Sequence, residues 1–293
     1  MLPNFVGIGA PKSATTWIYR CLDEHPEVFV SNVKETNYFS WRYESIPESK
    51  YEKYFKEAEN EKAVGEVCTA YLENEQAPKR IHDLIPNAKL FVSLRSPVDQ
   101  VYSHFWHLLR QNFHQSEKKR PDSFEEALDM YPDRLLKPAN YYTHIKRWTQ
   151  YYKLEKIHII IFDDLKENPQ STIQCLYGFL NVDPRFVPSG INKRDRSVRK
   201  GSSPRGPVFE KIYIKIYNLL INKIKYPISN AIGHKKTEKI KNKLRVREVM
   251  EFLFRSEGYP EMKEETRSFL KSYFKEEVEN LESLIERDLS DWK

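Results

Sequence analysis

The 293-residue sequence has few cysteines and no long apolar segment. Its three cysteines, Cys21, Cys68 and Cys175, are odd in number and far apart, which argues against a disulfide framework and against a zinc cluster. We expect all three to be reduced thiols in the core of a protein from a reducing compartment. No run of about 18 apolar residues occurs, so the sequence predicts no membrane-spanning helix.

The N-terminus also lacks the basic, apolar and small-residue zones of a secretory signal, so we expect the protein to stay in the cytoplasm. The composition, 40% hydrophobic and 31% charged, is that of a soluble globular protein. A surface helix is expected over 51–61, and a turn at 163–165 after a strand. Strand and helix patterns alternate along the chain. They predict one α/β domain over residues 1–293, with a central, mainly parallel sheet of four or five strands and helices on both faces.

The positive charge of the chain is concentrated in one block. The formal net charge is +6, yet residues 193–247 contain 17 Lys/Arg against three acidic residues, a net of +14 that leaves −8 elsewhere. Apolar residues recur at helical spacing among the lysines of 211–225, which predicts a basic helical insertion at about 199–254. Such a block favours an anionic acceptor or an anionic membrane surface, or is a solvated face. We expect no nucleic-acid partner.

The first strand pattern, at 5–8, leads into a loop that suits an anion. A helical pattern begins at Thr15. The N–H groups at a helix N-terminus lack partners inside the helix and carry the positive end of its dipole, so they bind anions readily. Lys12 adds a full charge to this cradle. Hydroxyl donors are added by Ser13, Thr15 and Thr16.

This loop differs from the nucleoside-triphosphate loop G-x-x-x-x-G-K-[ST], in which a glycine directly precedes the lysine. Here Pro11 precedes Lys12, and Ala14 stands where a glycine would be expected. A kinase or NTPase would also need a magnesium-binding aspartate at a strand end, which the sequence does not show. On this loop alone, an ordinary turn between strand and helix with a solvated lysine is as good an interpretation as a phosphate cradle.

A second strand pattern, at 89–94, is the clearest in the chain and has the continuous apolar character of a central parallel strand. It ends on Arg95. Ser96 and Pro97 suit the first turn of a following helix, and Ser103 lies two helical turns farther along. An arginine at a strand end can bind phosphate oxygens with two hydrogen bonds, while the serine donates from the side.

Together, the two segments resemble the cofactor motifs of sulfotransferases that use 3′-phosphoadenosine 5′-phosphosulfate (PAPS). Residues 11–17 (PKSATTW) resemble the 5′-phosphosulfate loop, and residues 95–103 (RSPVDQVYS) resemble the R-x7-S motif for the 3′-phosphate. Ala14 departs from the commoner glycine but is still small enough for close backbone approach. The resemblance implies a P-loop-like cofactor site formed by Pro11, Lys12, Ser13, Ala14, Thr15, Thr16, Trp17, Arg95 and Ser103.

Further segments resemble heparan sulfate sulfotransferases and their bacterial relatives. Residues 65–71 (GEVCTAY) resemble a segment whose glutamate acts as base, and residues 34–39 (KETNYF) one that lies near the acceptor. The resemblance implies that Glu66 takes the acceptor proton, while Lys12 neutralises charge on the bridging oxygen. Val67 departs from the lysine of the heparan enzymes, so the acceptor class stays open. A salt bridge to a core arginine is the other explanation of Glu66.

Three residues are candidates for acceptor binding: Lys34, Tyr71 and His144. His144 belongs to residues 141–148 (YYTHIKRW), which resemble a helix of the heparan enzymes, although a hydrogen-bonded helix histidine is the simpler interpretation. Two segments are candidates for completing the 3′-phosphate site: the RKG sequence of Arg199, Lys200 and Gly201, and residues 255–260 (RSEGYP). Residues 284–292 (LIERDLSDW) resemble the tail common in bacterial sulfotransferases.

These resemblances imply an enzyme that transfers a sulfonyl group from PAPS to a hydroxyl or amine and releases adenosine 3′,5′-bisphosphate (PAP), without a metal. The acceptor is a glycan, a lipid or a small metabolite. One alternative is a nucleotide kinase or NTPase of similar fold. Another is a non-catalytic module that binds anionic polymers or membranes, but such a module would not need Lys12, Glu66, Arg95 and Ser103 together.

Overall fold

The computed structural model describes residues 1–110, 121–191, 202–204 and 255–293. The chain forms two compact units, Met1–Val198 with Met262–Lys293, and Arg199–Glu261. The larger unit is an α/β structure. The described part of the smaller one contains an antiparallel pair of short strands, β6 (Ser202–Pro204) and β7 (Arg255–Glu257). The basic helices predicted at 211–225 lie outside the described residues.

A five-stranded sheet forms the centre of the larger unit, and every neighbouring pair of its strands is parallel. The strand order is β2-β3-β1-β4-β5. This confirms the predicted α/β class with a parallel central sheet. The strands are β1 (Phe5–Gly9), β2 (Val28–Val30), β3 (Ala63–Val67), β4 (Lys89–Leu94) and β5 (Ile157–Ile161). All residues of β1 and β3 are buried, as expected for parallel strands that are covered on both faces.

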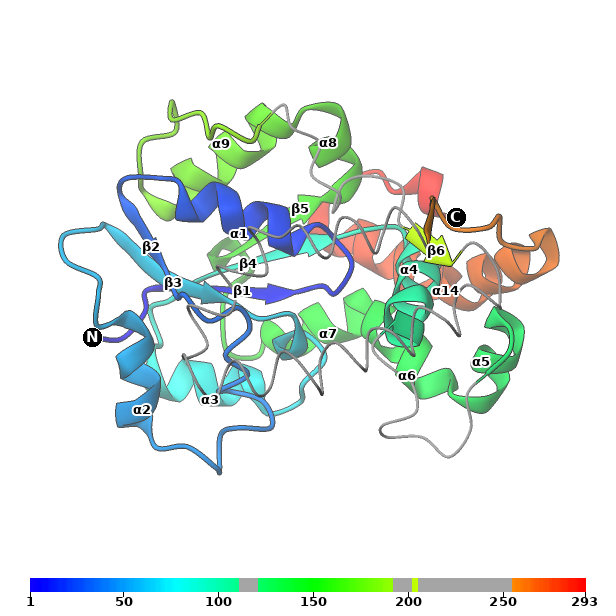
Figure 1. Ribbon diagram of the computed structural model, residues 1–293, viewed down its shortest axis with the longest axis horizontal. Helices are drawn as coiled ribbons and strands as arrows, with labels where there is room; N and C mark the ends of the chain where they lie inside the picture. The colour runs from blue at the N-terminus through cyan, green and yellow to red at the C-terminus, as the bar shows by residue number, and fades with distance from the viewer. Residues whose placement is uncertain (111–120, 192–201, 205–254) are drawn as a thin grey trace. The chain divides into compact units, whose positions relative to one another are not determined.

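Helices cover both faces of the sheet (Figure 1). Above it lie α1 (Thr15–Asp23), α8 (Phe162–Glu167) and α9 (Pro169–Leu180), whose apolar side chains form one core cluster. The opposite face packs into a second cluster with α3 (Ala77–Leu84), α4 (Pro97–Arg110), α7 (Tyr141–Trp148) and α14 (Glu264–Ile285). The shorter helices are α2 (Glu48–Glu52), α5 (Phe124–Met130) and α6 (Pro132–Leu136), with 3-10 turns at Lys53–Phe55, Thr69–Tyr71 (η2), Lys137–Ala139, Leu154–Lys156 and Ser290–Trp292.

Two local predictions are wrong. The helix expected over 51–61 is the short α2 followed by one 3-10 turn, Lys53–Phe55. Tyr51 and Phe55 are fully buried, so their spacing reflects two contacts with the core and not a long amphipathic helix. Residues 163–165, expected to be a turn, lie inside α8.

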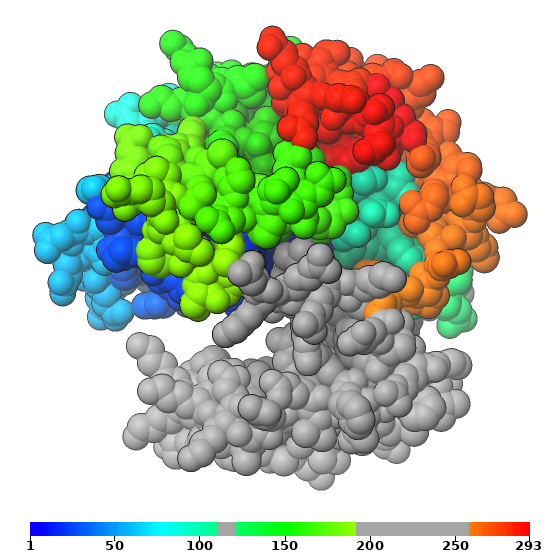
Figure 2. Space-filling view, turned by 90° about the horizontal axis from the view of Figure 1, so that it is seen from above, coloured from blue at the N-terminus to red at the C-terminus, as the bar shows by residue number. Residues whose placement is uncertain are grey.

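The C-terminal residues pack against α8. Arg287 Nη2 lies 2.5 Å from Asp164 Oδ1, and the indole N–H of Trp292 donates to Asp163 at 3.0 Å. Figure 2 shows the red C-terminal residues beside the green segment that contains α8. The tail at 284–292 therefore attaches the end of the chain to the helix that follows β5.

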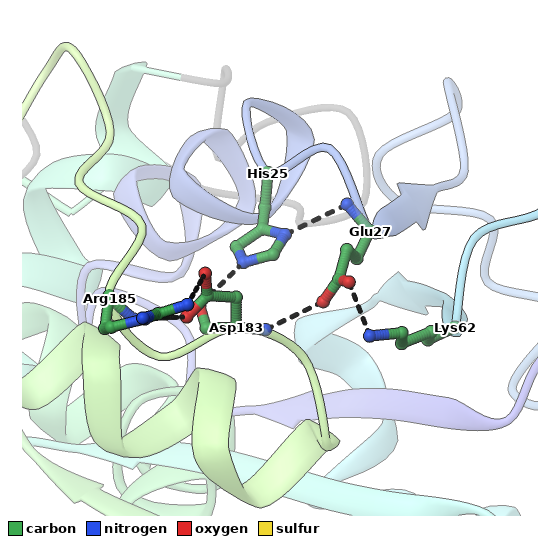
Figure 3. Close-up of polar contacts among 5 residues, drawn as sticks. All are labelled: His25, Glu27, Lys62, Asp183 and Arg185. Atoms are coloured by element: carbon green, nitrogen blue, oxygen red, sulfur yellow. Dashed lines mark hydrogen bonds and ion pairs between the residues drawn. The ribbon is translucent and has the colours of Figure 1, made fainter.

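A polar network connects the starts of two strands with the segment after α9 (Figure 3). The buried His25 accepts from the Glu27 N–H on Nδ1 at 3.1 Å, and its Nε2 lies 3.0 Å from the Asp183 carbonyl oxygen. Because Nδ1 accepts, the proton is on Nε2, which donates to Asp183. Glu27 also accepts from Lys62 at 2.5 Å. Glu27 precedes β2 and Lys62 precedes β3, so this network lies at the edge of the sheet opposite the strand ends that carry the predicted motifs.

Candidate functional site

The loops that follow β1, β3 and β4 meet at the carboxyl edge of the sheet. The chain leaves β1 toward β2 on one side, and it leaves β4 toward β5 on the other. β1 and β4 therefore form the switch point at which open α/β sheets bind their ligands. The Ala10 N–H donates to the Ser93 carbonyl at 2.9 Å, which joins the loop after β1 to the end of β4.

The loop between β1 and α1 has the backbone of an anion cradle. Lys12 and Ala14 have positive φ angles of 67° and 60°, a conformation that costs a non-glycine residue about 1–2 kcal/mol. Ala14 is the N-cap of α1, and the first turn of α1 contains no acidic residue. Left-handed residues in such a loop turn successive N–H groups toward one point, where an anion can bind.

Side chains from α4 and α7 enclose this loop. The amide nitrogen of Gln100 donates to the Pro11 carbonyl at 3.2 Å. The hydroxyl of Tyr141 lies close to Ser13 and to the backbone of Arg95, and burial raises its pKa. The cradle is therefore held by residues that follow β4 as well as by those that follow β1.

Several buried polar atoms around the cradle have no hydrogen-bond partner within the part of the chain that the structure describes. They include Gln100 Oε1, Arg95 Nε and His104 Nδ1. Buried polar atoms are nearly always hydrogen-bonded in folded proteins. Arg95 Nε is an N–H donor and fits an anionic oxygen of a ligand, whereas Gln100 Oε1 can only accept and fits a donor group.

Arg95 and Ser103 lie where the sequence predicts them, directly after β4 and two turns into α4. Arg95 Nη2 is 3.3 Å from Asp99 Oδ2, and the guanidinium carbon lies 4.9 Å from the centre of the Phe162 ring. Asp99 also lies 3.6 Å from Arg267 Nη1 on α14. These contacts hold the guanidinium at the strand end with a quarter of its side chain exposed, at 25%.

His104 also lies in this region, although the sequence motifs did not predict it as a site residue. Burial lowers its pKa to about 4, and the positive charges of Lys12 and Arg134 lower it further in the same direction. The imidazole is therefore neutral at neutral pH and lies within the field of the cradle lysine. Its place directly after Ser103 was the only sequence signal that could have indicated it.

A second group of polar residues lies around the end of β3. Glu66 is completely buried, and its carboxylate accepts from the hydroxyls of Thr36 at 2.5 Å, Tyr51 at 2.7 Å and Tyr71 at 3.1 Å. Burial raises the pKa of Glu66 to about 7, although the three hydroxyl bonds act in the opposite direction. The explanation of Glu66 as half of a core ion pair with arginine is wrong, because its partners are hydroxyls.

Glu35, unlike the buried Glu66, is a carboxylate of this group that is partly exposed. Both of its oxygens accept from the Thr69 hydroxyl, at 2.8 and 2.9 Å, and Lys34 Nζ lies 3.3 Å from Oε1. The side chain of Glu35 is 25% exposed and that of Lys34 15%. Lys34 and Glu35 both belong to the segment at 34–39 that the sequence predicts near the acceptor, but of the two only Lys34 was predicted as a site residue.

The anion cradle and the polar residues at the end of β3 are both attached to the last residues of β1. The cradle follows Gly9, while the Cys68 N–H donates to the Gly7 carbonyl and the Leu72 N–H to the Ile8 carbonyl, each at 2.8 Å. A Cβ atom on Gly9 would lie 2.7 Å from Leu72 Cβ, so glycine allows η2 to approach the strand this closely. Thr69 in η2 holds Glu35, so the Glu35 carboxylate is brought to the end of β1, where the cradle begins.

Residues 3–200 match the sulfotransferase domain family. The chain belongs to this family. A solved sulfotransferase from Alicyclobacillus acidocaldarius shares its fold, with a TM-score of 0.70 and 23% identity over 100% of this chain and 99% of that one. The matched range includes the cradle, Glu35, Glu66, Arg95 and Ser103.

Curated relatives are similar to this chain over most of its length. The bifunctional heparan sulfate N-deacetylase/N-sulfotransferase of Drosophila melanogaster is 28% identical over 225 residues, which are 68% of this chain and 21% of that protein. The membrane-associated sulfotransferase kil1 of Dictyostelium discoideum is 24% identical over 314 residues, 77% of this chain and 66% of that protein. The chain thus spans about a fifth of the Drosophila enzyme. Within the described residues of the present chain, no helix is long and apolar enough to cross a bilayer.

The other site residues predicted from the sequence lie in different surroundings. Trp17 is buried in the core cluster beneath α1. The Tyr71 hydroxyl is occupied by Glu66 and lies 2.9 Å from Thr36 Oγ1. His144 is buried with Nε2 2.7 Å from the Lys137 carbonyl oxygen, and burial lowers its pKa to about 4. Of the three candidates for acceptor binding, Lys34 alone is a charged side chain beside a carboxylate, and it is 15% exposed.

The structure tests neither candidate for completing the 3′-phosphate site. Arg199, Lys200 and Gly201 lie outside the described residues. Residues 255–260 belong to the smaller unit, in which Arg255 lies in β7 and Gly258 has a φ of 87°. Both remain predictions. The described residues contain no group of three or more His, Cys, Asp or Glu side chains that could hold a metal ion.

The raised pKa of Glu66 predicts a pH-dependent stability. The folded-state pKa of Glu66, about 7, lies above the ordinary glutamate value of 4.5. The free energy of unfolding therefore has its full contribution from protonated Glu66 below pH 4.5 and loses it as the pH rises to 7. One unit of pKa corresponds to 1.36 kcal/mol, so the loss is about 3 kcal/mol. Denaturant unfolding of the wild type and of Glu66→Gln from pH 4.5 to 8 should show a difference that changes by this amount.

Other groups titrate in the same range, so the comparison must be between proteins that differ at one carboxylate. Glu155→Gln is the control, because the Glu155 side chain is 73% exposed. Its unfolding free energy should stay parallel to that of the wild type across the pH range. A constant difference between the wild type and Glu66→Gln would contradict a Glu66 pKa near neutrality.

Proposed function

We propose that this sulfotransferase uses PAPS and transfers its sulfonyl group to a hydroxyl or amine of an acceptor. The observation that supports this most strongly is the pair of anion-binding elements at one switch point, the Lys12 loop after β1 and Arg95 after β4, whose buried Nε has no partner among the described residues. Two separate cationic elements suit a cofactor with phosphate groups at both ends of a nucleoside.

The cradle residues would hold the 5′-phosphosulfate, and Arg95 with Ser103 would hold the 3′-phosphate. When bound, PAPS supplies the sulfonyl group, whose sulfur gains a bond to the acceptor oxygen or nitrogen as its bond to the bridging phosphate oxygen breaks. Lys12 and the N–H groups at the start of α1 would neutralise the charge on that oxygen. Arg199, Lys200 and Gly201 remain proposed contributors to the 3′-phosphate site. The proposal requires no metal ion.

For the proton acceptor, the geometry favours Glu35 over Glu66. A general base must lie within hydrogen-bond distance of the proton that it removes. Glu66 has no exposed surface, and three hydroxyls occupy its oxygens. Glu35 is partly exposed, Lys34 Nζ lies 3.3 Å from its Oε1, and the Thr69 hydroxyl fixes its orientation. We infer that Glu35 takes the acceptor proton and that Lys34 lies beside the acceptor.

A glycan is the acceptor class with most support, because the Drosophila relative is a heparan sulfate enzyme by its name. The kil1 relative is described as membrane-associated, which keeps a lipid acceptor or a peripheral place at the cytoplasmic membrane face as the alternative. The basic block at 193–247 would serve either acceptor recruitment or membrane docking. Most of that block lies outside the described residues, so its role rests on its charge alone.

Binding of PAP, the expected product, tests the cofactor. A ligand that binds only the folded state at 100 times its dissociation constant adds about 2.7 kcal/mol of stability. We expect PAP to raise the melting temperature by several degrees, and adenosine 5′-monophosphate and ATP to do so much less, because they lack the 3′-phosphate. Equal stabilisation by ATP would exclude the proposed cofactor.

Turnover then tests the reaction. The protein is incubated with sulfur-labelled PAPS and three acceptors: N-desulfated heparin, a simple phenol and a glycolipid. Label should pass to N-desulfated heparin, which offers both amines and hydroxyls. Transfer only to the phenol or only to the glycolipid would replace the glycan by a small metabolite or a lipid. Tight PAP binding without transfer to any acceptor would favour a non-catalytic binding protein.

A further inference from the structure

The buried carboxylate of Glu66 is joined to the segment that carries Glu35. Thr36 donates to Glu66 Oε2 at 2.5 Å, and Thr36 is the residue that follows Glu35. The Thr36 hydroxyl oxygen also accepts from the Tyr38 N–H at 3.3 Å, and its carbonyl accepts from Arg42 Nη1 at 3.2 Å. One side chain therefore connects a strand of the central sheet with the backbone of the loop after β2.

Tyr71 adds a second connection between the same two parts. Its hydroxyl donates to Glu66 Oε1, lies 2.9 Å from Thr36 Oγ1 and accepts from the Phe39 N–H at 3.4 Å. The third hydroxyl on Glu66, from Tyr51, leads instead to α2. Two of the three bonds to Glu66 thus lead to residues 36–39, and one leads elsewhere.

We propose that Glu66 is a positioning residue, whose carboxylate holds Thr36 and thereby fixes Glu35 and Lys34 in the place from which Glu35 reaches the acceptor. The inference rests on the proposed function of Glu35 as base. Thr69, which lies three residues after Glu66, holds the Glu35 carboxylate itself. Both ends of Glu35 are then fixed from the end of β3: its backbone through Glu66 and Thr36, and its carboxylate through Thr69.

The chain offers a matched pair of variants. Thr36→Val and Tyr51→Phe each remove one hydroxyl from Glu66, but the first bond leads to the Glu35 segment and the second to α2. Tyr51→Phe keeps the ring that stacks on Tyr38 at 4.2 Å. A displacement of about 1 Å at a reacting group can cost a factor of 100 in rate. We expect kcat with PAPS and N-desulfated heparin to fall about 10-fold or more in Thr36→Val and to change less than 2-fold in Tyr51→Phe, with PAP affinity retained in both.

Thr36→Ser should restore kcat, because it restores the hydroxyl. The double variant Thr36→Val/Glu35→Gln tests whether Thr36 acts through Glu35. If it does, the double variant should be no slower than Glu35→Gln alone. Once the base is absent, its misplacement by Thr36→Val costs no further rate. Multiplicative losses in the double variant, or equal losses in Thr36→Val and Tyr51→Phe, would overturn the positioning role.

Hydrogen exchange provides a readout that needs no acceptor. In Thr36→Val and in Glu66→Gln, the peptide that contains Tyr38 and Phe39 should exchange faster, because those N–H groups bond to Thr36 and Tyr71. Exchange in β4 and α1 should stay unchanged. Unaltered exchange at 38–39 in both variants would show that Glu66 does not hold the segment. Normal turnover of Glu35→Gln would instead remove the base on which the inference rests, and PAP binding would show whether the cofactor assignment survives.

Discussion

Glu35→Gln is expected to lower kcat by a factor of about 100 to 10,000, the usual contribution of a general base. The substitution keeps the shape of the side chain and one oxygen that can still accept from Thr69. Folding and PAP affinity should therefore be close to those of the wild type. Single-turnover transfer from labelled PAPS to N-desulfated heparin, together with PAP titration, separates loss of chemistry from loss of binding.

The comparison with Glu66→Gln decides between the two carboxylates. If Glu35 is the base, Glu66→Gln loses activity only to the extent that the Lys34–Glu35 pair moves. Glu44→Gln is the control, since Glu44 lies nearby in the chain, is 84% exposed and contacts Arg80. Loss of turnover in Glu66→Gln with normal turnover in Glu35→Gln would make Glu66 the base, as the sequence resemblance implied.

The positions of the Lys12 loop and of Arg95 could be predicted from sequence because each of these elements is local. The apolar run 89–94 and the helix start at Pro97 place Arg95 at a strand end without any distant contact. The cradle likewise depends on a short strand followed at once by a helix. Two such elements needed only a parallel sheet to bring them to one edge, and the alternating pattern predicted that sheet.

The carboxylate side could not be predicted in the same way because its chemistry depends on contacts between distant segments. The partners of Glu66 come from the loop after β2, from α2 and from η2. Nothing within β3 shows that its glutamate would be enclosed by three hydroxyls and have no exposed surface. Conversely, Glu35 is ordinary in its own segment and becomes distinctive only when Thr69 holds it at the end of β3.

Contacts between distant segments also explain the two local predictions that were wrong, the helix at 51–61 and the turn at 163–165. Over 51–61 the apolar spacing suits a helix, but Tyr51 is used to bond Glu66 and Phe55 to fill the core, and helix α2 ends at Glu52. At 163–165 two aspartates suggested a turn, but Asp163 and Asp164 bond to the C-terminal tail and lie in a helix. In both cases a partner far away in the sequence decided the local structure.

Arg95 is the side chain whose removal should most weaken cofactor binding. Its guanidinium is fixed by Asp99 and by the face of Phe162, so little conformational freedom is lost when a phosphate binds. Hydrogen bonds to charged groups contribute about 1.5–3 kcal/mol each. The buried Nε, which has no partner among the described residues, adds a donor on the same fork.

Arg95→Ala is therefore expected to weaken PAP binding by a factor of about 10 to 150, equivalent to 1.5–3 kcal/mol, as measured by isothermal titration. Arg95→Lys should recover only part of the loss, because an ammonium group cannot form the two parallel bonds of a guanidinium. Adenosine 5′-monophosphate should bind the wild type and Arg95→Ala almost equally, since it lacks the 3′-phosphate. Arg267→Ala is the control: it removes the other contact of Asp99, at 3.6 Å, and should leave PAP affinity unchanged. An Arg95→Ala protein that binds PAP as tightly as the wild type would move the 3′-phosphate site away from the end of β4.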